Sequence, residues 1–219
     1  MREWLSRQCS IGAAGVATAK RLLRPLPGVP DQGNGILMRI SQCIVPDVLL
    51  LEPSVFSDNR GFLFESFNQR AFKQATGLDV YFVQDNHCRS SHNVLRGLHH
   101  QIVRPQGKLV RVVAGEVFDV VVDIRRSSPT FGKWAGHLLS AANNHQLWVP
   151  PGLAHGFLVL SDSADFLYKT TDYYAPEHER CIAWNDPTLV IDWPLGGAVP
   201  LISGKDAAGR PFLQADLPD

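Results

Sequence analysis

The sequence predicts an all-β fold, and two observations support that prediction. In the second half of the chain, short runs of β-branched and aromatic residues recur roughly every ten residues with turn residues between them, a pattern typical of a β-sandwich or barrel and not of alternating βαβ units. The chain has 219 residues, 45% of them hydrophobic, which suits the core of a single all-β domain. We therefore expect one β domain with one or two short helices.

Residues 1–37 differ in composition from the rest of the chain. They are rich in basic residues and in Ala and Gly, and they end in a Pro- and Gly-rich stretch before regular β patterning begins at Met38. The apolar run is short for a signal peptide and too short for a spanning helix. We expect an N-terminal extension over residues 1–37, disordered or weakly helical, and a domain over residues 38–219 whose working start could be Met38.

Charge and cysteine content exclude several classes of protein. The 21 basic and 21 acidic residues cancel, so no overall field favours nucleic acid or an anionic membrane, and we expect neither as a partner. The four cysteines form no C-x-x-C pair and predict neither a zinc site nor a disulfide framework. A reducing compartment, the cytoplasm, fits best. These cysteines are Cys9, Cys43, Cys88 and Cys181.

The first elements of the domain are a proline-bounded strand, a second strand and a helix. Residues 44–52 are apolar but contain Pro46, which predicts an edge strand followed by a turn over residues 53–59. Residues 58–67 predict a strand whose phenylalanines can bury, with Arg60 and Glu65 at its ends. Residues 68–77 have an N-cap residue, helix formers and a terminal glycine, which predict a short helix.

The remaining elements are all predicted to be strands. Residues 109–113 and 117–124 are strongly β-branched and are joined by Ala114-Gly115-Glu116, which predicts a hairpin. Further strands are expected at residues 81–86, 94–101, 134–139, 146–149, 156–160, 166–174 and 181–184.

The strand at residues 94–101 carries two adjacent histidines. Because side chains alternate across a strand, His99 and Gln101 share one face and His100 lies on the other. Further along, Pro151-Gly152-x-x-His155 resembles the second motif of cupins, and its spacing from Gly97-x-His99 resembles theirs too. This resemblance implies a double-stranded β-helix, or cupin jelly roll, whose cavity receives His99 and His155.

Metal binding is not expected at this strand. Many cupins hold a metal with two histidines at positions i and i+2, a glutamate and a later histidine. Here Gln101 occupies the i+2 position, His99 and His100 point to opposite faces, and Glu116 lies in the predicted hairpin turn.

Seven further motifs accompany Arg96-Gly97-Leu98-His99-His100-Gln101. In register, the set resembles the dTDP-4-dehydrorhamnose 3,5-epimerases, a metal-free cupin family, over residues 38–215. His100 stands where the family usually has an aromatic residue, and Cys181 where it usually has glycine. The other motifs are Asp58-x-Arg60-Gly61-Phe62, Gln84-Asp85-Asn86-His87, Gln106-Gly107-Lys108-Leu109-Val110-Arg111, Pro151-Gly152-x-x-His155-Gly156-Phe157, Tyr168-Lys169-x-Thr171-x-Tyr173-Tyr174, Trp184-Asn185-Asp186-Pro187 and Ser203-x-Lys205-Asp206.

The resemblance implies catalytic roles for four residues. Inverting a carbon next to a 4-keto group needs a base, a donor for the enolate oxygen and an acid on the opposite face. By resemblance, His99 is the base, Asp206 its partner, Lys108 the enolate-stabilising cation and Tyr174 the acid. From the residues alone, Asp206 fits a helix cap or turn, Lys108 a solvated strand end, and the tyrosine a packed core or interface residue.

The resemblance also implies a substrate and a partner. The substrate is dTDP-4-dehydro-6-deoxyglucose, no cofactor is needed, and the protein is a homodimer in which a strand including Arg60 and Glu65 reaches the neighbour's site. Arg60 and Arg96 suit the diphosphate, although Arg60 alone could form a surface salt bridge with Glu65 or Asp58. The implied substrate-binding residues are Arg60, Glu65, Gln84, Asn86, Arg96 and His155.

Other functions on the same scaffold stay open. A single-site epimerase or a keto isomerase of another dTDP-deoxysugar pathway would share these motifs. A metal-dependent cupin oxygenase would contain a transition metal, and a nucleotide-sugar-binding cupin without activity would bind the sugar and exchange no protons.

Overall fold

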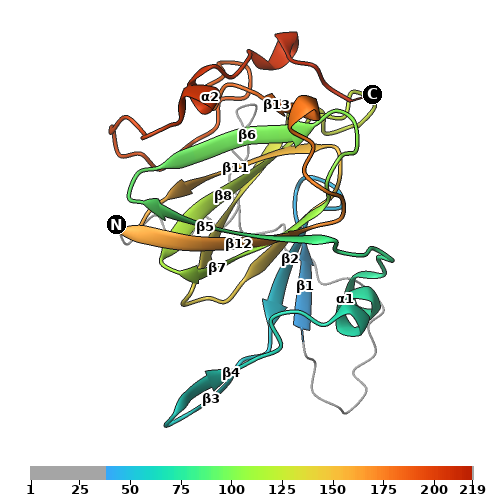
Figure 1. The fold of residues 1–219 in the computed structure, drawn as a ribbon, viewed down its shortest axis with the longest axis vertical. Helices are drawn as coiled ribbons and strands as arrows, with labels where there is room; N and C mark the ends of the chain where they lie inside the picture. The colour runs from blue at the N-terminus through green and yellow to red at the C-terminus, as the bar shows by residue number, and fades with distance from the viewer. Residues whose placement is uncertain (1–37, 219) are drawn as a thin grey trace.

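A computed structural model describes residues 38–218 and contains two antiparallel β-sheets packed face to face. The predicted extension over residues 1–37 lies outside the described residues. One sheet has six strands in the order β1-β2-β10-β7-β12-β5, and the other has five in the order β13-β6-β11-β8-β9. The all-β jelly roll with a few short helices is confirmed, and Figure 1 shows the two sheets one above the other.

The strands are three to eight residues long. They are β1 (Met38–Gln42), β2 (Leu49–Pro53), β3 (Phe56–Asp58), β4 (Gly61–Leu63), β5 (Gln84–Ser91), β6 (Leu95–Gln101), β7 (Lys108–Ala114), β8 (Glu116–Asp123), β9 (Trp134–Ser140), β10 (Gln146–Val149), β11 (Leu153–Val159), β12 (Ser163–Thr170) and β13 (Glu179–Cys181). The helices are α1 (Gln69–Thr76), α2 (Gly204–Ala207) and the 3₁₀ turns Pro176–His178 and Phe212–Gln214.

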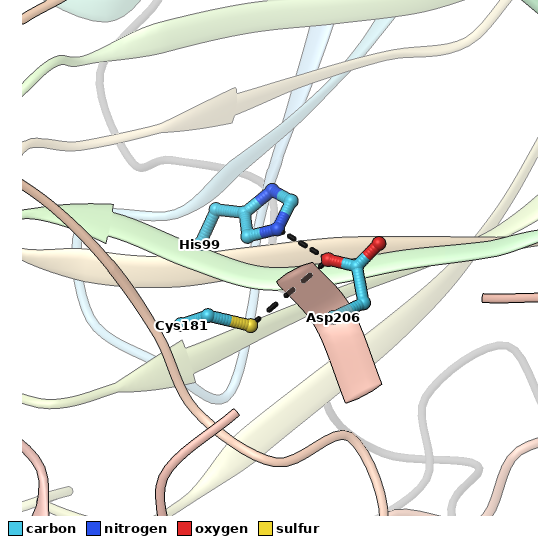
Figure 2. Close-up of side chains that lie close together, drawn as sticks. All are labelled: His99, Cys181 and Asp206. Carbon is cyan, nitrogen blue, oxygen red and sulfur yellow. Dashed lines mark hydrogen bonds and ion pairs between the residues drawn. The ribbon is translucent and has the colours of Figure 1, made fainter. Parts of the chain in front are cut away.

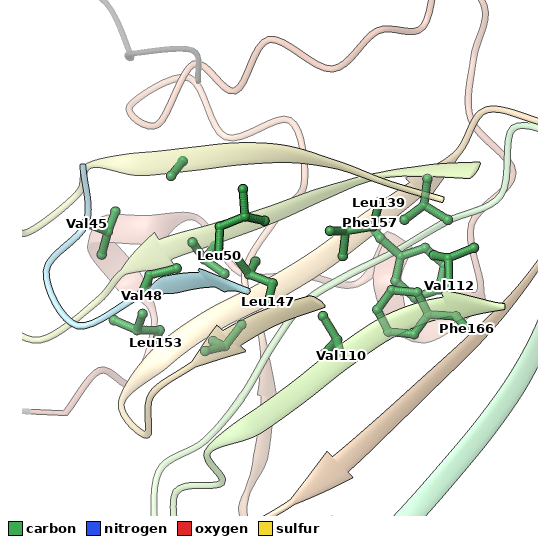
Figure 3. Close-up of a cluster of buried hydrophobic side chains, with 14 of the residues drawn as sticks. Val45, Val48, Leu50, Val110, Val112, Leu139, Leu147, Leu153, Phe157 and Phe166 are labelled. Carbon is green, nitrogen blue, oxygen red and sulfur yellow. The ribbon is translucent and has the colours of Figure 1, made fainter. Parts of the chain in front are cut away.

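The main core lies between the two sheets. Alternate side chains of both sheets meet there, as expected for two sheets that each bury one face. Phe157 of β11 stacks on Phe166 of β12 with ring centroids 4.2 Å apart, so the two sheets are in direct contact. Figure 3 shows this cluster, which includes Val45, Leu50, Val110, Val112, Leu139, Leu147 and Leu153.

The C-terminal segment covers the outer face of the five-stranded sheet. Leu189, Trp193 and Phe212 pack there on Leu98 and Phe118, and Figure 1 shows this segment lying over β6. The same covering segment contains α2, so the burial that stabilises it also fixes the position of Asp206.

Helix α1 has the boundaries that its caps predict. The Asn68 side chain accepts hydrogen bonds from the backbone N–H groups of Arg70 and Ala71, and Gly77 adopts a left-handed conformation with φ of 74°. These are the usual N-terminal and C-terminal signals of a helix. The expected helix over residues 68–77 is therefore confirmed, with Phe72 as its buried anchor.

Two strand predictions are wrong in their pairing. Residues 109–113 and 117–124 do not form a hairpin: β7 pairs with β10 and β12, whereas β8 pairs with β9 and β11 in the other sheet. Gly115, with φ of 75°, turns the chain from one sheet to the other, so Glu116 begins β8. The expected edge strand over residues 44–52 is also wrong, since β2 begins at Leu49 and pairs on both sides.

The strand expected over residues 58–67 is instead the second half of a small hairpin. β3 pairs with β4 around Asn59 and Arg60, and Phe62 is 64% exposed instead of buried. Phe67 does pack against the cluster under α1. Figure 1 shows this hairpin projecting away from the two sheets, and its aromatic side chains Phe56 and Phe62 are 62% and 64% exposed.

The other strands occur near their expected positions with shifted ends. β9 and β10 match closely, whereas β5, β11, β12 and β13 begin or end several residues away from the predicted limits. Within residues 38–218, the helices are too short to cross a lipid bilayer.

Candidate active site

A cavity of about 350 Å³ opens between the two sheets. Its wall combines polar side chains of β5, β6, β7, β11 and β13 with aromatic rings of β11 and β12. Seven of the ten predicted site residues line it, all except Asp206, Arg60 and Glu65. The lining residues include Gln84, Asn86, Cys88, Arg96, His99, Gln106, Lys108, His155, Phe166, Tyr168, Tyr174 and Glu179.

His99 on β6 and Asp206 on α2 form a hydrogen-bonded pair at the cavity wall. The His99 Nε2 and Asp206 Oδ1 atoms are 2.5 Å apart, and a dashed line marks this contact in Figure 2. Because an ionised carboxylate only accepts, the imidazole donates from Nε2, and Nδ1 is left as the basic nitrogen. The resemblance placed these two residues together although 107 positions separate them, and the structure brings them into contact.

Asp206 is held as a carboxylate by several donors. It is 4% exposed, and besides His99 it accepts from the Ser203 hydroxyl at 2.7 Å and the Gly97 N–H at 3.3 Å. Burial opposes ionisation, but the hydrogen bonds from His99 and Ser203 outweigh it and lower the pKa of Asp206 to about 2. Ser203 also caps α2 by accepting from the Asp206 backbone N–H, so the residue that begins this helix also holds the Asp206 carboxylate.

Lys108 is the first residue of β7 and faces the cavity. Burial is the main cause that lowers its pKa from 10.5 to about 8, and Glu179 and Asp119 partly offset this effect. Within residues 38–218 its amino group forms no hydrogen bond or ion pair, so the group is available to a ligand. The expectation that it faces the cavity and not the solvent agrees with this position.

Tyr174 lies in the loop after β12 at the mouth of the cavity and is 51% exposed. Its hydroxyl donates to Glu179 Oε2 at 2.5 Å, and this hydrogen bond raises the pKa of Tyr174 to about 12. Glu179 also forms an ion pair with Lys205, and its Oε1 lies 3.9 Å from His99 Nδ1.

Sequence reasoning missed two residues of this wall, Tyr168 and Glu179, and also Lys205, which forms an ion pair with Glu179. Tyr168 on β12 lines the cavity with a more buried ring than Tyr174, and burial raises the pKa of its hydroxyl. Tyr168 and Lys205 stood within the recognised motifs, and the alternation of side chains along β12, which puts Phe166 and Tyr168 on one face, was the signal for Tyr168.

The predicted nucleotide and sugar contacts gather on β5, β6 and β11. Gln84 Nε2 donates to Asn86 Oδ1 at 3.0 Å, and Arg96 Nε donates to the Ser90 hydroxyl at 3.0 Å. His155 Nε2 lies 3.0 and 2.9 Å from the two carboxylate oxygens of Asp119, which is fully buried.

Arg60 and Glu65 do not reach the cavity of their own chain. Arg60 lies at the tip of the β3–β4 hairpin with its side chain 86% exposed and paired with Asp58 at 2.5 Å. Glu65 accepts a hydrogen bond from Asn68 at 3.1 Å. Of the salt bridges considered for Arg60 from the sequence, the one with Asp58 is formed.

His100 and Gln101 have structural partners. His100 donates from Nε2 to the carbonyl of Asp216 at 2.8 Å, and burial lowers its pKa. The Gln101 side chain donates to the carbonyl of Arg104 and accepts from the backbone N–H of Ala175. Gln101, which stands two residues after His99, therefore links the loop that contains Arg104 to the loop that contains Ala175.

The jelly roll and its cavity define a cupin-type protein equipped for proton transfer, since a histidine–aspartate pair, a half-buried lysine and tyrosine hydroxyls face one space. The dTDP-4-dehydrorhamnose 3,5-epimerase family model matches residues 42–214, and the chain belongs to this family.

Individual relatives support this membership. The dTDP-4-dehydrorhamnose 3,5-epimerase of Pseudomonas aeruginosa is 64% identical over 179 residues, covering 82% of this chain and 98% of that protein. The Legionella pneumophila dTDP-6-deoxy-D-glucose-3,5-epimerase, solved with dTDP-4-keto-L-rhamnose, superposes with a TM-score of 0.80 at 52% identity, covering 83% of this chain and 97% of that one.

A more distant relative has a narrower described activity. ChmJ, a 3'-monoepimerase from Streptomyces bikiniensis, superposes with a TM-score of 0.75 at 34% identity, covering 78% of this chain and 86% of that one. It was solved with dTDP as a double mutant in which a histidine and a tyrosine are replaced.

Proposed function

We propose that this protein is a cytoplasmic isomerase that inverts carbons 3 and 5 of dTDP-4-dehydro-6-deoxy-D-glucose and yields dTDP-4-dehydro-L-rhamnose in dTDP-L-rhamnose biosynthesis. The observation that carries this proposal is the His99–Asp206 pair at the wall of the cavity. Family membership and the sugar nucleotide bound by the Legionella pneumophila relative support the same substrate class.

His99 is the proposed base. Its Nε2–H is engaged by Asp206, so Nδ1 accepts the proton from the carbon next to the 4-keto group. Asp206 stabilises the imidazolium that results, as the carboxylate does in a catalytic triad. A histidine placed in this way accelerates proton transfer by about 10²–10⁴-fold.

Lys108 is the proposed donor to the enolate oxygen. Removing the proton leaves negative charge on the 4-keto oxygen, and a preorganised cation on the cavity wall stabilises it by about 3 kcal/mol. The unpaired amino group of Lys108 on the cavity wall fits this role. Side chains supply every proton transfer and charge in this scheme, so the proposed reaction uses no metal or organic cofactor.

A tyrosine is the proposed acid, and there are two candidates. Tyr174 was selected by resemblance, but its hydroxyl is committed to Glu179 and has its pKa raised to about 12, which makes proton donation harder. Tyr168 is deeper in the cavity, and its hydroxyl forms no hydrogen bond within residues 38–218. The number of residues from His99 to Tyr168 is also nearly the number from the replaced histidine to the replaced tyrosine of ChmJ. We therefore favour Tyr168 and keep Tyr174 as the rival.

The remaining polar side chains are proposed to hold the substrate. Arg96 on β6 suits the diphosphate because a guanidinium binds two phosphate oxygens at once. Gln84 and Asn86 on β5 and His155 on β11 add hydrogen bonds around the nucleotide and the sugar.

Arg60 and Glu65 are proposed to act on the site of a second copy in a homodimer. The β3–β4 hairpin projects from the body with Phe62 and Leu63 exposed, and an exposed aromatic arm of this kind is typical of a surface that pairs with another chain. Insertion of this arm into the neighbouring subunit would bury those side chains and place Arg60 near the diphosphate.

Incubation with dTDP-4-dehydro-6-deoxyglucose in deuterated water tests the function. We expect proton NMR of the product to show deuterium and inversion at carbons 3 and 5. Deuterium at one carbon alone would favour a monoepimerase such as ChmJ, and a shifted keto group a keto isomerase. Binding without exchange would mean a silent sugar-binding protein, and consumption of oxygen a metal-dependent oxygenase.

A further inference from the structure

Cys181 lies beside the His99–Asp206 pair. Its Sγ atom is 4.0 Å from Asp206 Oδ1, and the three donor atoms of His99, Cys181 and Asp206 all lie within 4.8 Å of one another. Two elements create this arrangement: Cys181 of β13 pairs with His99 of β6 in the antiparallel ladder, and α2 delivers Asp206 from the other side. Figure 2 shows the three side chains converging.

We propose that these three side chains form an inhibitory site for Zn²⁺ or a similar borderline-soft divalent cation. An imidazole nitrogen, a thiolate and a carboxylate oxygen are the three donor types that zinc takes in proteins. This set is distinct from the cupin pattern of histidines at i and i+2, which Gln101 interrupts. The hard cation Mg²⁺, which prefers oxygen ligands in an octahedron, does not suit a site with a sulfur and a nitrogen donor.

The distances permit a tetrahedral ion after small side-chain movements. With zinc bonds of the usual lengths, donor atoms around a tetrahedron are roughly 3.3–3.6 Å apart. The His99–Asp206 separation of 2.5 Å must therefore widen, and the Cys181–Asp206 separation of 4.0 Å must close slightly. These two changes are each under about 1 Å by the same bond lengths, and the His99 and Cys181 donor atoms already lie within 4.8 Å of each other. The three protein ligands leave a fourth position for water.

Binding would disable the base. The cation takes the Nε2 lone pair of His99, so the imidazole proton moves to Nδ1, the nitrogen that accepts the substrate proton in the proposed function. The cation also replaces the Cys181 thiol proton, which is released to solvent as the metal–sulfur bond forms. The metal site itself rests on geometry alone, whereas its inhibitory effect rests on the proposed function.

Cobalt binding and zinc inhibition test the two parts separately. Chelator-treated full-length protein is titrated with Co²⁺, and thiolate-to-cobalt charge-transfer absorption is recorded. Epimerisation is then measured against Zn²⁺ concentration, with Mg²⁺ as the hard-cation control. The variants are Cys181→Ala, Cys181→Ser and, as a matched control, Cys88→Ala, which removes another half-buried thiol that is outside the donor cluster.

We expect the charge-transfer band in the wild type and in Cys88→Ala, and its loss in both Cys181 variants. Relative to its own activity without metal, each Cys181 variant should need at least about tenfold more Zn²⁺ for half-inhibition, because a ligand matters at least as much as the outer-shell partners whose loss costs 10–100-fold. Absence of the band from the wild type, or its persistence in the Cys181 variants, would overturn the site. Equal zinc sensitivity of wild type and variants would overturn its inhibitory role. A protein that shows the band but no epimerisation would count against the proposed function and not against the site.

Discussion

His99 and His155 lie directly opposite each other on the neighbouring strands β6 and β11, and each ring is bonded through Nε2 to its own buried aspartate. Asp206 holds the first ring and Asp119 the second. The two side chains differ in access, since that of His99 is 26% exposed and that of His155 is 8% exposed. The same local arrangement thus leaves the His99 ring, the proposed base, accessible and the His155 ring buried in the cavity wall.

Replacing Asp119 by Asn tests the role of the second pair. Asn keeps the shape of the side chain but removes the carboxylate that orients His155, so we expect weaker substrate binding and a stability loss of about 1–3 kcal/mol, the cost of a lost hydrogen bond to a charged group. Steady-state kinetics and thermal unfolding measure both effects. KM should change more than kcat, and an unaltered KM would show that His155 does not contact substrate.

Replacing Asp206 by Asn tests the catalytic pair. The Ser203 cap of α2 is retained, but the amide no longer fixes the His99 tautomer or stabilises its charged form. We expect kcat to fall by about 10²–10⁴-fold, the contribution of a well-placed acid–base group, with the fold intact by circular dichroism. Solvent-deuterium exchange into the keto sugar is the measurement. Exchange near the wild-type rate would remove His99 and Asp206 from the proposed chemistry.

The variants Tyr168→Phe and Tyr174→Phe distinguish the two candidate acids. Phe keeps each ring and removes only the hydroxyl. If Tyr168 is the acid, Tyr168→Phe lowers the rate of inversion by about 10²-fold or more, while the base still exchanges deuterium into the starting sugar. Tyr174→Phe, which loses only its hydrogen bond to Glu179, should lower the rate far less. The reverse order of effects, measured by product NMR, would assign the acid to Tyr174.

The lowered pKa of Lys108 predicts that activity falls and stability rises as the pH increases above about 8. Its pKa of about 8 in the folded protein lies below its value of 10.5, so activity should fall as the pH rises through about 8 and the cation is lost. Between about pH 8 and 10.5 the unfolded chain holds a proton that the folded chain has released, so the contribution of Lys108 to stability becomes more favourable as the pH rises.

The variant Lys108→Met separates these effects. Methionine fills the same space without a buried charge, so we expect the free energy of unfolding at pH 7 to rise by about 1–3 kcal/mol. Activity should fall by about 10²–10³-fold because the enolate loses its donor. Urea unfolding at pH 7 and pH 10 and rates across the same range provide the measurements. A less stable variant at pH 7 would mean that the lysine is not penalised by burial.

The sequence predicted the positions of helices and strands better than it predicted which strands pair with each other. The caps at Asn68 and Gly77 defined α1 because they act within one helical turn. The β-branched runs before and after Gly115 identified two strands but not their partners, since the same pattern suits a hairpin and a crossing between sheets. Phe62 looked like a core residue because aromatic strands usually have one buried face, yet it belongs to an isolated hairpin.

The candidate site was likewise predictable in its local features but not in its contacts between distant segments. The strand alternation placed His99 apart from His100, and their partners Asp206 and Asp216 confirm that the two rings have different surroundings. The contact with Asp206 joins segments 107 positions apart and came only from resemblance. Cys181 departs from the family pattern, but its place beside the His99–Asp206 pair depends on the register of β13 and β6, which local sequence does not specify.

Mixing two inactive variants tests the exchanged hairpin. In a homodimer with Arg60 acting on the neighbouring cavity, Arg60→Ala damages the site of the other subunit, whereas His99→Ala damages its own. A mixed dimer of the two variants then contains one site with both residues intact, so activity should return when the variants are unfolded and refolded together and not when each is refolded alone. Analytical ultracentrifugation confirms the dimer. Arg39→Ala, a change on β1 outside the cavity and the hairpin, serves as the matched arginine control and should be active alone. If Arg60→Ala and His99→Ala fail to complement each other while both form dimers, Arg60 does not work across the interface.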